Sequence, residues 1–271
     1  MPGMLPSRRI PFCLLFAVLL LSACSTVPIS GRRQINLISS NEINSMSFTS
    51  YKEFLGSHQL SADAENAAMV KKTGRNIQLA VEKYFVDNDM SDRLDGYEWE
   101  FNLLEEDTIN AWCMPGGKVV VYSGILPLTR DETGLAVVLG HEIAHAVANH
   151  GNERMSQGLM VEMGGAALSQ ALEEQPEATR SLFLTSFGLG AQVGVVLPYS
   201  RLHENEADHL GLIFMAMAGY DPREAVDFWK RMAAGKSGAT PEFLSTHPSD
   251  QKRIDNIKSL MPEALKYYKK S

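Results

Sequence analysis

The stretch that decides the fold is His141-Glu142-Ile143-Ala144-His145, an H-E-x-x-H sequence. On a helix, residues four positions apart lie one turn apart on the same face, so the two imidazoles of this stretch can bind one metal ion. Glu142 projects from the flank of that face, where it can reach a water at the metal without being a ligand itself. The motif therefore indicates the catalytic centre of a zinc-dependent hydrolase.

Outward from this motif, the spacing of apolar residues predicts a mostly helical chain with a small β-sheet, an α+β fold. The motif lies in a helix predicted from Thr133 to Asn149, with Gly151 as its stop. Two segments, 97–104 and 118–122, are rich in alternating or β-branched apolar residues and are predicted to be strands. Further helices are predicted over residues 41–55, 62–84, 153–172, 177–195, 200–218 and 222–234, and a final helix is predicted after Pro248, ending near Lys266.

A catalytic zinc ion keeps about three protein ligands and one open position, so two histidines need one more side chain from elsewhere. The stretch His203-Glu204-Asn205-Glu206-Ala207-Asp208-His209 supplies five candidates, and spacing alone does not choose among them. On a helix, Glu204 and Asp208 share a face, while Glu206 points roughly the other way. Glu204 and Asp208 could therefore act together, one as a ligand and the other as the acceptor for the outer N–H of a ligating histidine.

Four motifs in a fixed order resemble one known family. They are the H-E-x-x-H stretch, Ser200-Arg201 followed by Glu204-x-x-Ala207-Asp208, Asn110-Ala111-Trp112-Cys113-Met114-Pro115-Gly116-Gly117, and Ser245-Thr246-His247-Pro248-Ser249. Their combination, over roughly Gln59 to Leu260, resembles the gluzincin metallopeptidases of the HtpX and CAAX-prenyl-protease type. Soluble bacterial lipoproteins of that family and the related mitochondrial stress peptidases look most similar. Trp112 and Cys113 stand where the family more commonly has Phe and Ala, which bears on substrate preference.

The resemblance implies a zincin-like fold and one Zn²⁺ ion per chain. The implied zinc ligands are His141, His145 and Glu204, supported by Asp208. In the implied mechanism, zinc lowers the pKa of a bound water toward about 7 and polarises the scissile carbonyl, while Glu142 is the general base. His247 is the candidate catalytic donor to the developing oxyanion. Two alternatives for His247 stay open: a loop histidine bonded to local backbone, or a cap on the zinc that holds the enzyme latent.

The segment Ala111-Trp112-Cys113-Met114 is predicted to be an edge strand beside the motif helix, on which a substrate backbone can pair by β-addition. Such pairing reads main chain rather than side chains, which suits unfolded or mis-assembled protein segments. The expected function is that of a zinc-dependent endopeptidase for protein quality control in the bacterial cell envelope. The alternative is a lipoprotein chaperone or scaffold for outer-membrane protein assembly, with latent or no protease activity.

The N-terminus predicts export followed by lipid anchoring. Residues 1–23 carry two arginines before an apolar stretch that ends in small residues, which is typical of a signal peptide. Leu21-Ser22-Ala23-Cys24 resembles a lipobox, which implies cleavage before Cys24 and acylation of its thiol. The alternative is an uncleaved anchor with an incidental cysteine. By the same resemblance, Ser25 favours the outer membrane, so the expected location is its periplasmic face.

The rest of the chain is predicted to be a tether and one domain. Residues 24–40 are polar, with proline and glycine, and are expected to have little structure of their own. Residues 41–271 are expected to form a single zinc metallopeptidase domain, whose oligomeric state the sequence does not indicate.

Charge argues against a nucleic-acid-binding protein, and the cysteine content argues against a fold held by disulfides. Removing residues 1–23 moves the formal net charge from −7 to −9, because that segment carries two arginines and no acidic residue. An acidic body argues against nucleic-acid binding. Cys113 is then the one cysteine without a lipid, so no internal disulfide is available and a buried thiol is expected. His150 lies about 140° around the helix from His145 and is expected to be structural rather than a metal ligand.

Overall fold

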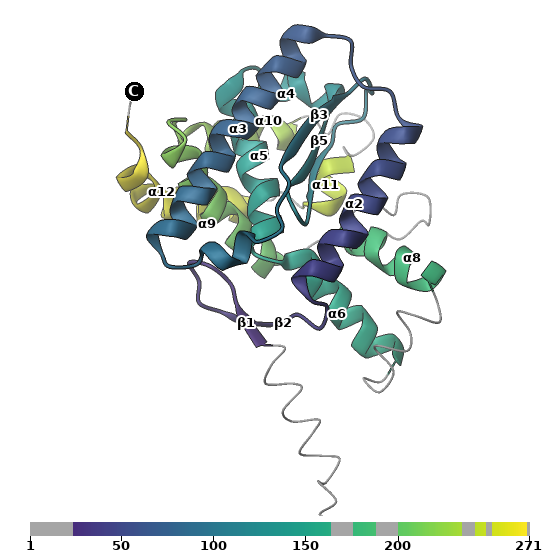
Figure 1. The fold of residues 1–271 in the computed structure, drawn as a ribbon. Helices are drawn as coiled ribbons and strands as arrows, with labels where there is room; N and C mark the ends of the chain where they lie inside the picture. Colours follow the sequence, from purple (N-terminus) through teal and green to yellow (C-terminus); the bar gives the residue numbers. More distant parts are fainter. Residues whose placement is uncertain (1–23, 164–175, 188–199, 235–241, 248–250, 270–271) are drawn as a thin grey trace, which may run out of the picture.

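The computed structural model describes residues 24–163, 176–187, 200–234, 242–247 and 251–269. Over these residues the predicted α+β fold is confirmed, because the chain is mostly helical with two small sheets (Figure 1). The helices are α2 (Ser40–Ser57), α3 (Ala64–Asp87), α4 (Leu126–Thr129), α5 (Glu132–Val147), α6 (His150–Met163), α8 (Pro176–Ser186), α9 (Arg201–Met217), α10 (Glu224–Ala234), α11 (Glu242–Thr246) and α12 (Gln251–Tyr267). The strands are β1 (Cys24–Thr26), β2 (Arg33–Ile35), β3 (Glu100–Leu104), β4 (Ala111–Met114) and β5 (Lys118–Tyr122). The predicted helices over 153–172 and 177–195 run partly outside the described residues, as does Pro248.

The larger sheet has the strand order β3-β5-β4, with β3 parallel and β4 antiparallel to the central β5. The strand β4 is therefore an edge strand, as its sequence predicts. The sharp turn between β4 and β5 needs glycine, since Gly116 and Gly117 have φ angles of 77° and 83°. A Cβ atom on Gly117 would lie 2.6 Å from the ring of Trp99, so space as well as backbone conformation excludes a side chain there.

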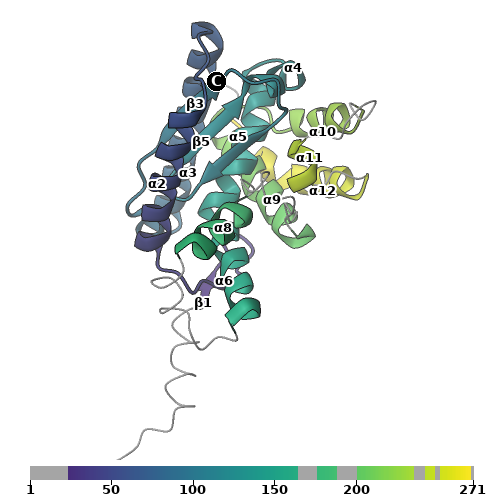
Figure 2. The same ribbon diagram turned by 90° about the vertical axis from the view of Figure 1, so that its right-hand side faces the viewer.

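The sheet is covered on both faces, which explains why β5 is a nearly continuous apolar run. Successive side chains of a strand point to opposite faces. Val119 and Val121 join the core formed with α3, α5 and α9, while Val120 and Tyr122 join a second core formed with α2, α6 and α8. Figure 2 shows the sheet between α2 on one side and α5 on the other. The motif helix α5 therefore sits in the larger core, where residues 134–147 are all buried.

The helices α5 and α9 pack closely because glycines meet where they cross. A Cβ atom on Gly140 would lie 2.9 Å from the carbonyl oxygen of Gly211, which is closer than real Cβ contacts. Gly140 directly precedes His141, and Gly211 follows Asp208 by less than one helical turn. This crossing brings the polar faces of two helices far apart in sequence into direct contact.

The motif helix ends earlier than the sequence predicts. The helix α5 ends at Val147, and Asn149 adopts a left-handed conformation with φ of 59° before α6 begins at His150. The predicted stop at Gly151 is wrong, because asparagine can take the left-handed position that usually falls to glycine. The chain therefore turns between His145 and His150.

The prediction that residues 24–40 have little structure is also wrong. They form an antiparallel hairpin of β1 and β2 that lies against α6 (Figures 1 and 2), followed by the start of α2. Val27 is buried, and Gln34 donates its side-chain amide to the carbonyl oxygen of Ala148 at 3.0 Å. Proline and glycine in this segment make the turn of a hairpin rather than a loose linker. Within the described residues, no helix combines the length and the apolar character needed to cross a bilayer.

Candidate metal centre

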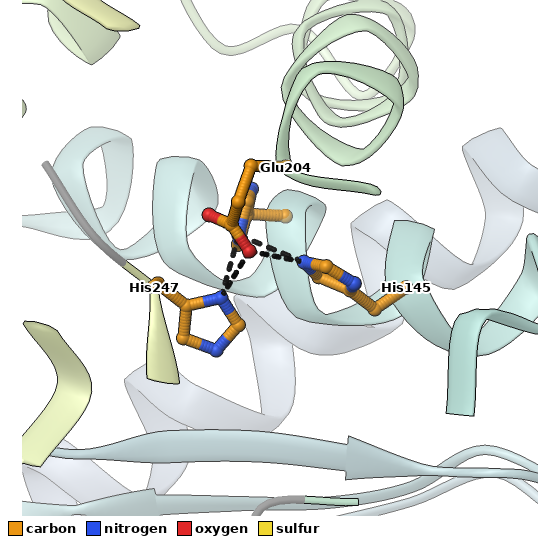
Figure 3. A group of neighbouring side chains, drawn as sticks. His145, Glu204 and His247 are labelled. Carbon is orange, nitrogen blue, oxygen red and sulfur yellow. Dashed lines mark hydrogen bonds and ion pairs between the residues drawn. The ribbon is translucent and has the colours of Figure 1, made fainter. Parts of the chain in front are cut away.

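Three separate parts of the chain bring the possible ligand atoms together. His141 and His145 lie one turn apart on α5, Glu204 lies in the first turn of α9, and His247 follows the short helix α11. One ligand atom from each of these four side chains lies within 4.8 Å of the other three. All four side chains are buried. Figure 3 shows His145, Glu204 and His247 pointing toward one common point.

Four of the six distances within this group are close to those of a tetrahedral metal site. Ligands at 2.0–2.1 Å from a tetrahedral zinc ion lie about 3.3–3.4 Å from one another. The Nε2 atom of His141 lies 3.1 Å from Nε2 of His145 and 3.2 Å from Nδ1 of His247. Oε1 of Glu204 lies 3.3 Å from Nε2 of His145 and 3.0 Å from Nδ1 of His247. Three imidazole nitrogens and one carboxylate oxygen at these separations fit a zinc ion.

Asp208 and Arg253 surround this donor group. Oδ1 of Asp208 lies 3.0 Å from Nδ1 of His141, so it can accept a hydrogen bond from the Nδ1–H, in the tautomer that leaves Nε2 free for a metal. Arg253 of α12 donates to both oxygens of Asp208, at 2.7 and 2.9 Å. Another of its nitrogens lies 2.6 Å from Oε2 of Glu204, and the guanidinium stacks on Trp229 at 3.5 Å from the ring centroid. Arg253 therefore ties the two carboxylates of α9 together.

The charges in the group favour a cation at its centre. Burial raises the pKa of Glu204. The charges of Arg253 and His247 lower it by more than burial raises it, so the pKa lies well below its usual range. Burial and Arg253 lower the pKa of His141, yet Asp208 and Glu204 raise it more, to about 9. Burial lowers the pKa of His145. Zinc binds an ionised carboxylate and neutral imidazoles, and these side chains can supply both.

Glu142 lies beside the donor group without belonging to it. Its side chain is buried, and its Oε1 atom accepts no hydrogen bond from the protein. Nε2 of His247 lies 3.5 Å from this Oε1 atom. Burial raises the pKa of Glu142, and the charge of Glu204 adds to this shift. A buried carboxylate with an unused acceptor is placed to receive a proton from a bound reactant.

The strand β4 borders this centre, because it packs directly against α5. Its residues Ala111, Trp112, Cys113 and Met114 are all buried. The Cys113 thiol is free, as predicted, and burial raises its pKa, with a smaller contribution from the charge of Glu142. The residues of β4 are thus part of the core. At the other end of the described chain, Cys24 is the first residue of β1.

Sequence reasoning missed two contacts around the centre, one made by Arg253 and one made by His150. Arg253 lies six residues after His247 with no motif of its own, so only the tertiary fold reveals its contact with α9. His150 stays outside the donor group, as predicted, but its Nδ1 atom lies 3.0 Å from Nδ1 of His145. The sequence feature that could have predicted this contact is Asn149, because asparagine tolerates the left-handed conformation that turns the chain between His145 and His150.

Comparisons with known proteins show similarity to metallopeptidases. The model of peptidase family M48 matches residues 71–261. The chain is 39% identical over 245 residues to the mitochondrial metalloendopeptidase OMA1 of Schizosaccharomyces pombe, which covers 88% of this chain and 66% of that protein. It is 29% identical over 265 residues to the human protein named metalloendopeptidase OMA1, mitochondrial, covering 94% of this chain and 49% of that protein. It is 28% identical over 166 residues to the beta-barrel assembly-enhancing protease of Escherichia coli, covering 59% of this chain and 34% of that protein. The chain spans 66% or less of each of these relatives.

The expected location at the periplasmic face of a bacterial outer membrane is contradicted by these comparisons. Relatives at 39% and 34% identity are mitochondrial metalloendopeptidases, and they match more of the chain than the bacterial protease does. The expectation relied on a lipobox-like stretch of four residues and on Ser25. A pattern that short recurs by chance and does not fix a compartment.

Proposed function

Because the chain belongs to peptidase family M48, we propose that it is a zinc-dependent endopeptidase that cleaves extended segments of unfolded or mis-assembled proteins. The observation that carries this proposal is the group of four buried donor atoms, with four mutual separations of 3.0–3.3 Å and Glu142 beside it. Bound by His141, His145 and Glu204, zinc would lower the pKa of a water and polarise a scissile carbonyl.

The protein side chains divide the remaining work. Glu142 takes a proton from the attacking water and delivers it to the leaving amine, since its buried Oε1 atom has no other hydrogen-bond partner. Asp208 holds the Nδ1–H of His141 and so fixes its tautomer. Arg253 holds Asp208 in that position and also orients Glu204.

The proposed substrate class follows from the edge strand β4. It pairs only with β5 among the strands of the described residues, so its second edge can receive a substrate backbone. Main-chain pairing makes few demands on side chains, but it requires an extended segment. Folded proteins rarely offer one, whereas unfolded or mis-assembled proteins do.

The test of this function uses the full chain, its zinc content and an unfolded substrate such as casein. We expect about one zinc ion per chain and cleavage of casein that stops with a chelator and returns when zinc is added back. A protein that holds zinc but cleaves nothing, even after His247→Ala, would instead favour the role of a chaperone or scaffold.

His247 supports a further point about the resting enzyme. Its Nδ1 atom takes the fourth tetrahedral position, at 3.0 Å from Oε1 of Glu204 and 3.2 Å from Nε2 of His141. A catalytic site keeps that position for water. We therefore propose that the observed arrangement is latent, and that His247 leaves the fourth position before a substrate is cleaved.

His247→Ala is therefore expected to raise the rate of casein cleavage. If the uncapped form makes up about a tenth of the molecules, the gain is about tenfold. The measurement is the initial rate per bound zinc ion, with His209→Ala as the control, because His209 pairs with Glu263 at the surface. A rate that falls while the zinc content stays constant would show that His247 stabilises the transition state instead.

The proposals for the N-terminus are carried by sequence alone. Removal of residues 1–23, a lipid on Cys24 and a catalytic domain over 41–271 stay predictions. The docked hairpin of β1 and β2 extends the folded part of the chain back to Cys24, so an anchor there would hold the domain without a long tether.

A further inference from the structure

A second buried cluster of charged and ring side chains adjoins the metal centre. Its members are His150 and Glu153 of α6, His203 and Glu206 of α9, and Arg32 of the N-terminal hairpin. His150 is fully buried, and the exposed fractions of the Glu153 and Glu206 side chains are 7% and 5%. None of the catalytic steps above uses these residues.

Arg32 is the centre of this cluster. Its guanidinium donates to both oxygens of Glu153, at 2.8 and 2.7 Å, and to both oxygens of Glu206, at 2.9 and 3.0 Å. The planar guanidinium fork suits such two-point contacts with carboxylates, which a lysine could not reproduce. Ser30 adds its hydroxyl to Glu206 at 2.7 Å. The turn of the hairpin thus fixes Glu206 from one side.

Glu206 connects Arg32 to the possible metal ligand His145, because it contacts His150 and His150 contacts His145. Its Oε2 atom lies 3.1 Å from Nε2 of His150, and Nδ1 of His150 lies 3.0 Å from Nδ1 of His145. The ring of His203, held by Glu153, stacks on His150 at a centroid distance of 4.6 Å. The ring of His150 is therefore held by contacts at both of its nitrogen atoms and by stacking on one of its faces.

The order of protons along this chain follows from the position of His145. Its Nε2 atom belongs to the donor group, so the ring proton resides on Nδ1 and is donated to Nδ1 of His150. Nδ1 of His150 is then the acceptor, and its Nε2–H donates to Glu206. Each ring has one tautomer that satisfies the whole chain.

We propose that the N-terminal hairpin is a positioning element of the metal centre: Arg32 holds Glu206, and Glu206 acts through His150 to orient the ring and fix the tautomer of the ligand His145. His141 has a direct carboxylate partner in Asp208, whereas His145 depends on this longer chain. Docking of the hairpin therefore raises the affinity of the centre for zinc. This inference rests on the proposed function only in that a zinc ion occupies the donor group.

The test compares Arg32→Met with Arg33→Met in the full chain. Arg33 is the matched control, since it is the next residue of the same hairpin and its side chain is exposed. Zinc affinity is measured by competition with a chelator, and the ligand geometry by the visible spectrum of the cobalt-loaded protein. We expect Arg32→Met to weaken zinc binding about 10-fold or more, as outer partners of metal ligands do, and to change the cobalt spectrum. Arg33→Met should change neither.

A double variant separates a relay from a general loss of packing. If Arg32 acts through His150, then Arg32→Met adds little to the loss of affinity already caused by His150→Gln. Full additivity of the two losses would overturn the relay. Should Arg32→Met fail to fold, Arg32→Lys decides by the same criteria, because it keeps the charge but loses the two-sided fork.

The remaining outcomes separate this inference from the proposed function. An unaltered chain that binds zinc, with Arg32→Met binding it equally well and with the same cobalt spectrum, overturns the relay alone. An unaltered chain that binds no zinc overturns both the relay and the proposed enzyme.

Discussion

Glu142→Gln is expected to lower the rate of peptide cleavage about 10²–10⁴-fold while leaving the zinc content unchanged. Glutamine has almost the same shape as glutamate, but it cannot take up a proton. Glu142 does not belong to the group of four donor atoms, so its charge is not needed to hold the metal. Its Oε1 atom is buried without a hydrogen bond, and burial raises the pKa of the Glu142 carboxyl group, which makes it a stronger base.

The measurement is the cleavage rate per bound zinc ion, made in the His247→Ala background so that capping does not mask the effect. Glu132→Gln is the matched control, since Glu132 lies on the same helix and pairs with Lys72 near the surface. A surface pair of this kind contributes about 1 kcal/mol or less to stability, so the control should cleave at the rate of its background. Full activity in Glu142→Gln would remove Glu142 as the base, and loss of zinc would make it a ligand.

The part of the site that the sequence predicts is the part governed by local geometry. His141 and His145 share a helical face because of their spacing, and Glu204 and Asp208 share one for the same reason. The two glycines at the crossing of α5 and α9 then bring these faces together. A helical period is a property of the sequence itself, so these expectations needed no knowledge of the tertiary fold.

The part that the sequence does not predict depends on the path of the chain. Glu206 points away from Glu204 along α9, as its spacing implies, but its partners Arg32 and His150 are supplied by two other segments. His150 reaches His145 only because α5 ends at Val147 and the backbone turns at Asn149. The predicted helix continued past Val147, and a continued helix would hold the ring of His150 about 140° around its axis from His145. The hairpin was missed because its two strands have only three residues each.

Arg253→Met is expected to lower the free energy of unfolding by about 3–5 kcal/mol, because it leaves two buried carboxylates without their shared cation. Arg253 donates two hydrogen bonds to Asp208 and a third nitrogen lies 2.6 Å from Glu204. Methionine preserves much of the apolar contact with Trp229, so the loss reports the charge rather than the packing. For a chain of this size, the midpoint of thermal unfolding should fall by ~6–20 °C.

Urea unfolding of the variant and the unaltered chain gives this difference, with Arg231→Met as the control. Arg231 also packs beside an aromatic ring, but its partner Glu224 is partly exposed, so a smaller loss of about 1 kcal/mol is expected. Adding Asp208→Asn to Arg253→Met should recover part of the lost stability, since it removes one of the two unpaired charges. Bound zinc should offset another part, because its charge compensates Glu204. An Arg253→Met protein as stable as the unaltered chain would mean that water reaches these carboxylates, and that the donor group is held in place by α5 and α9 alone.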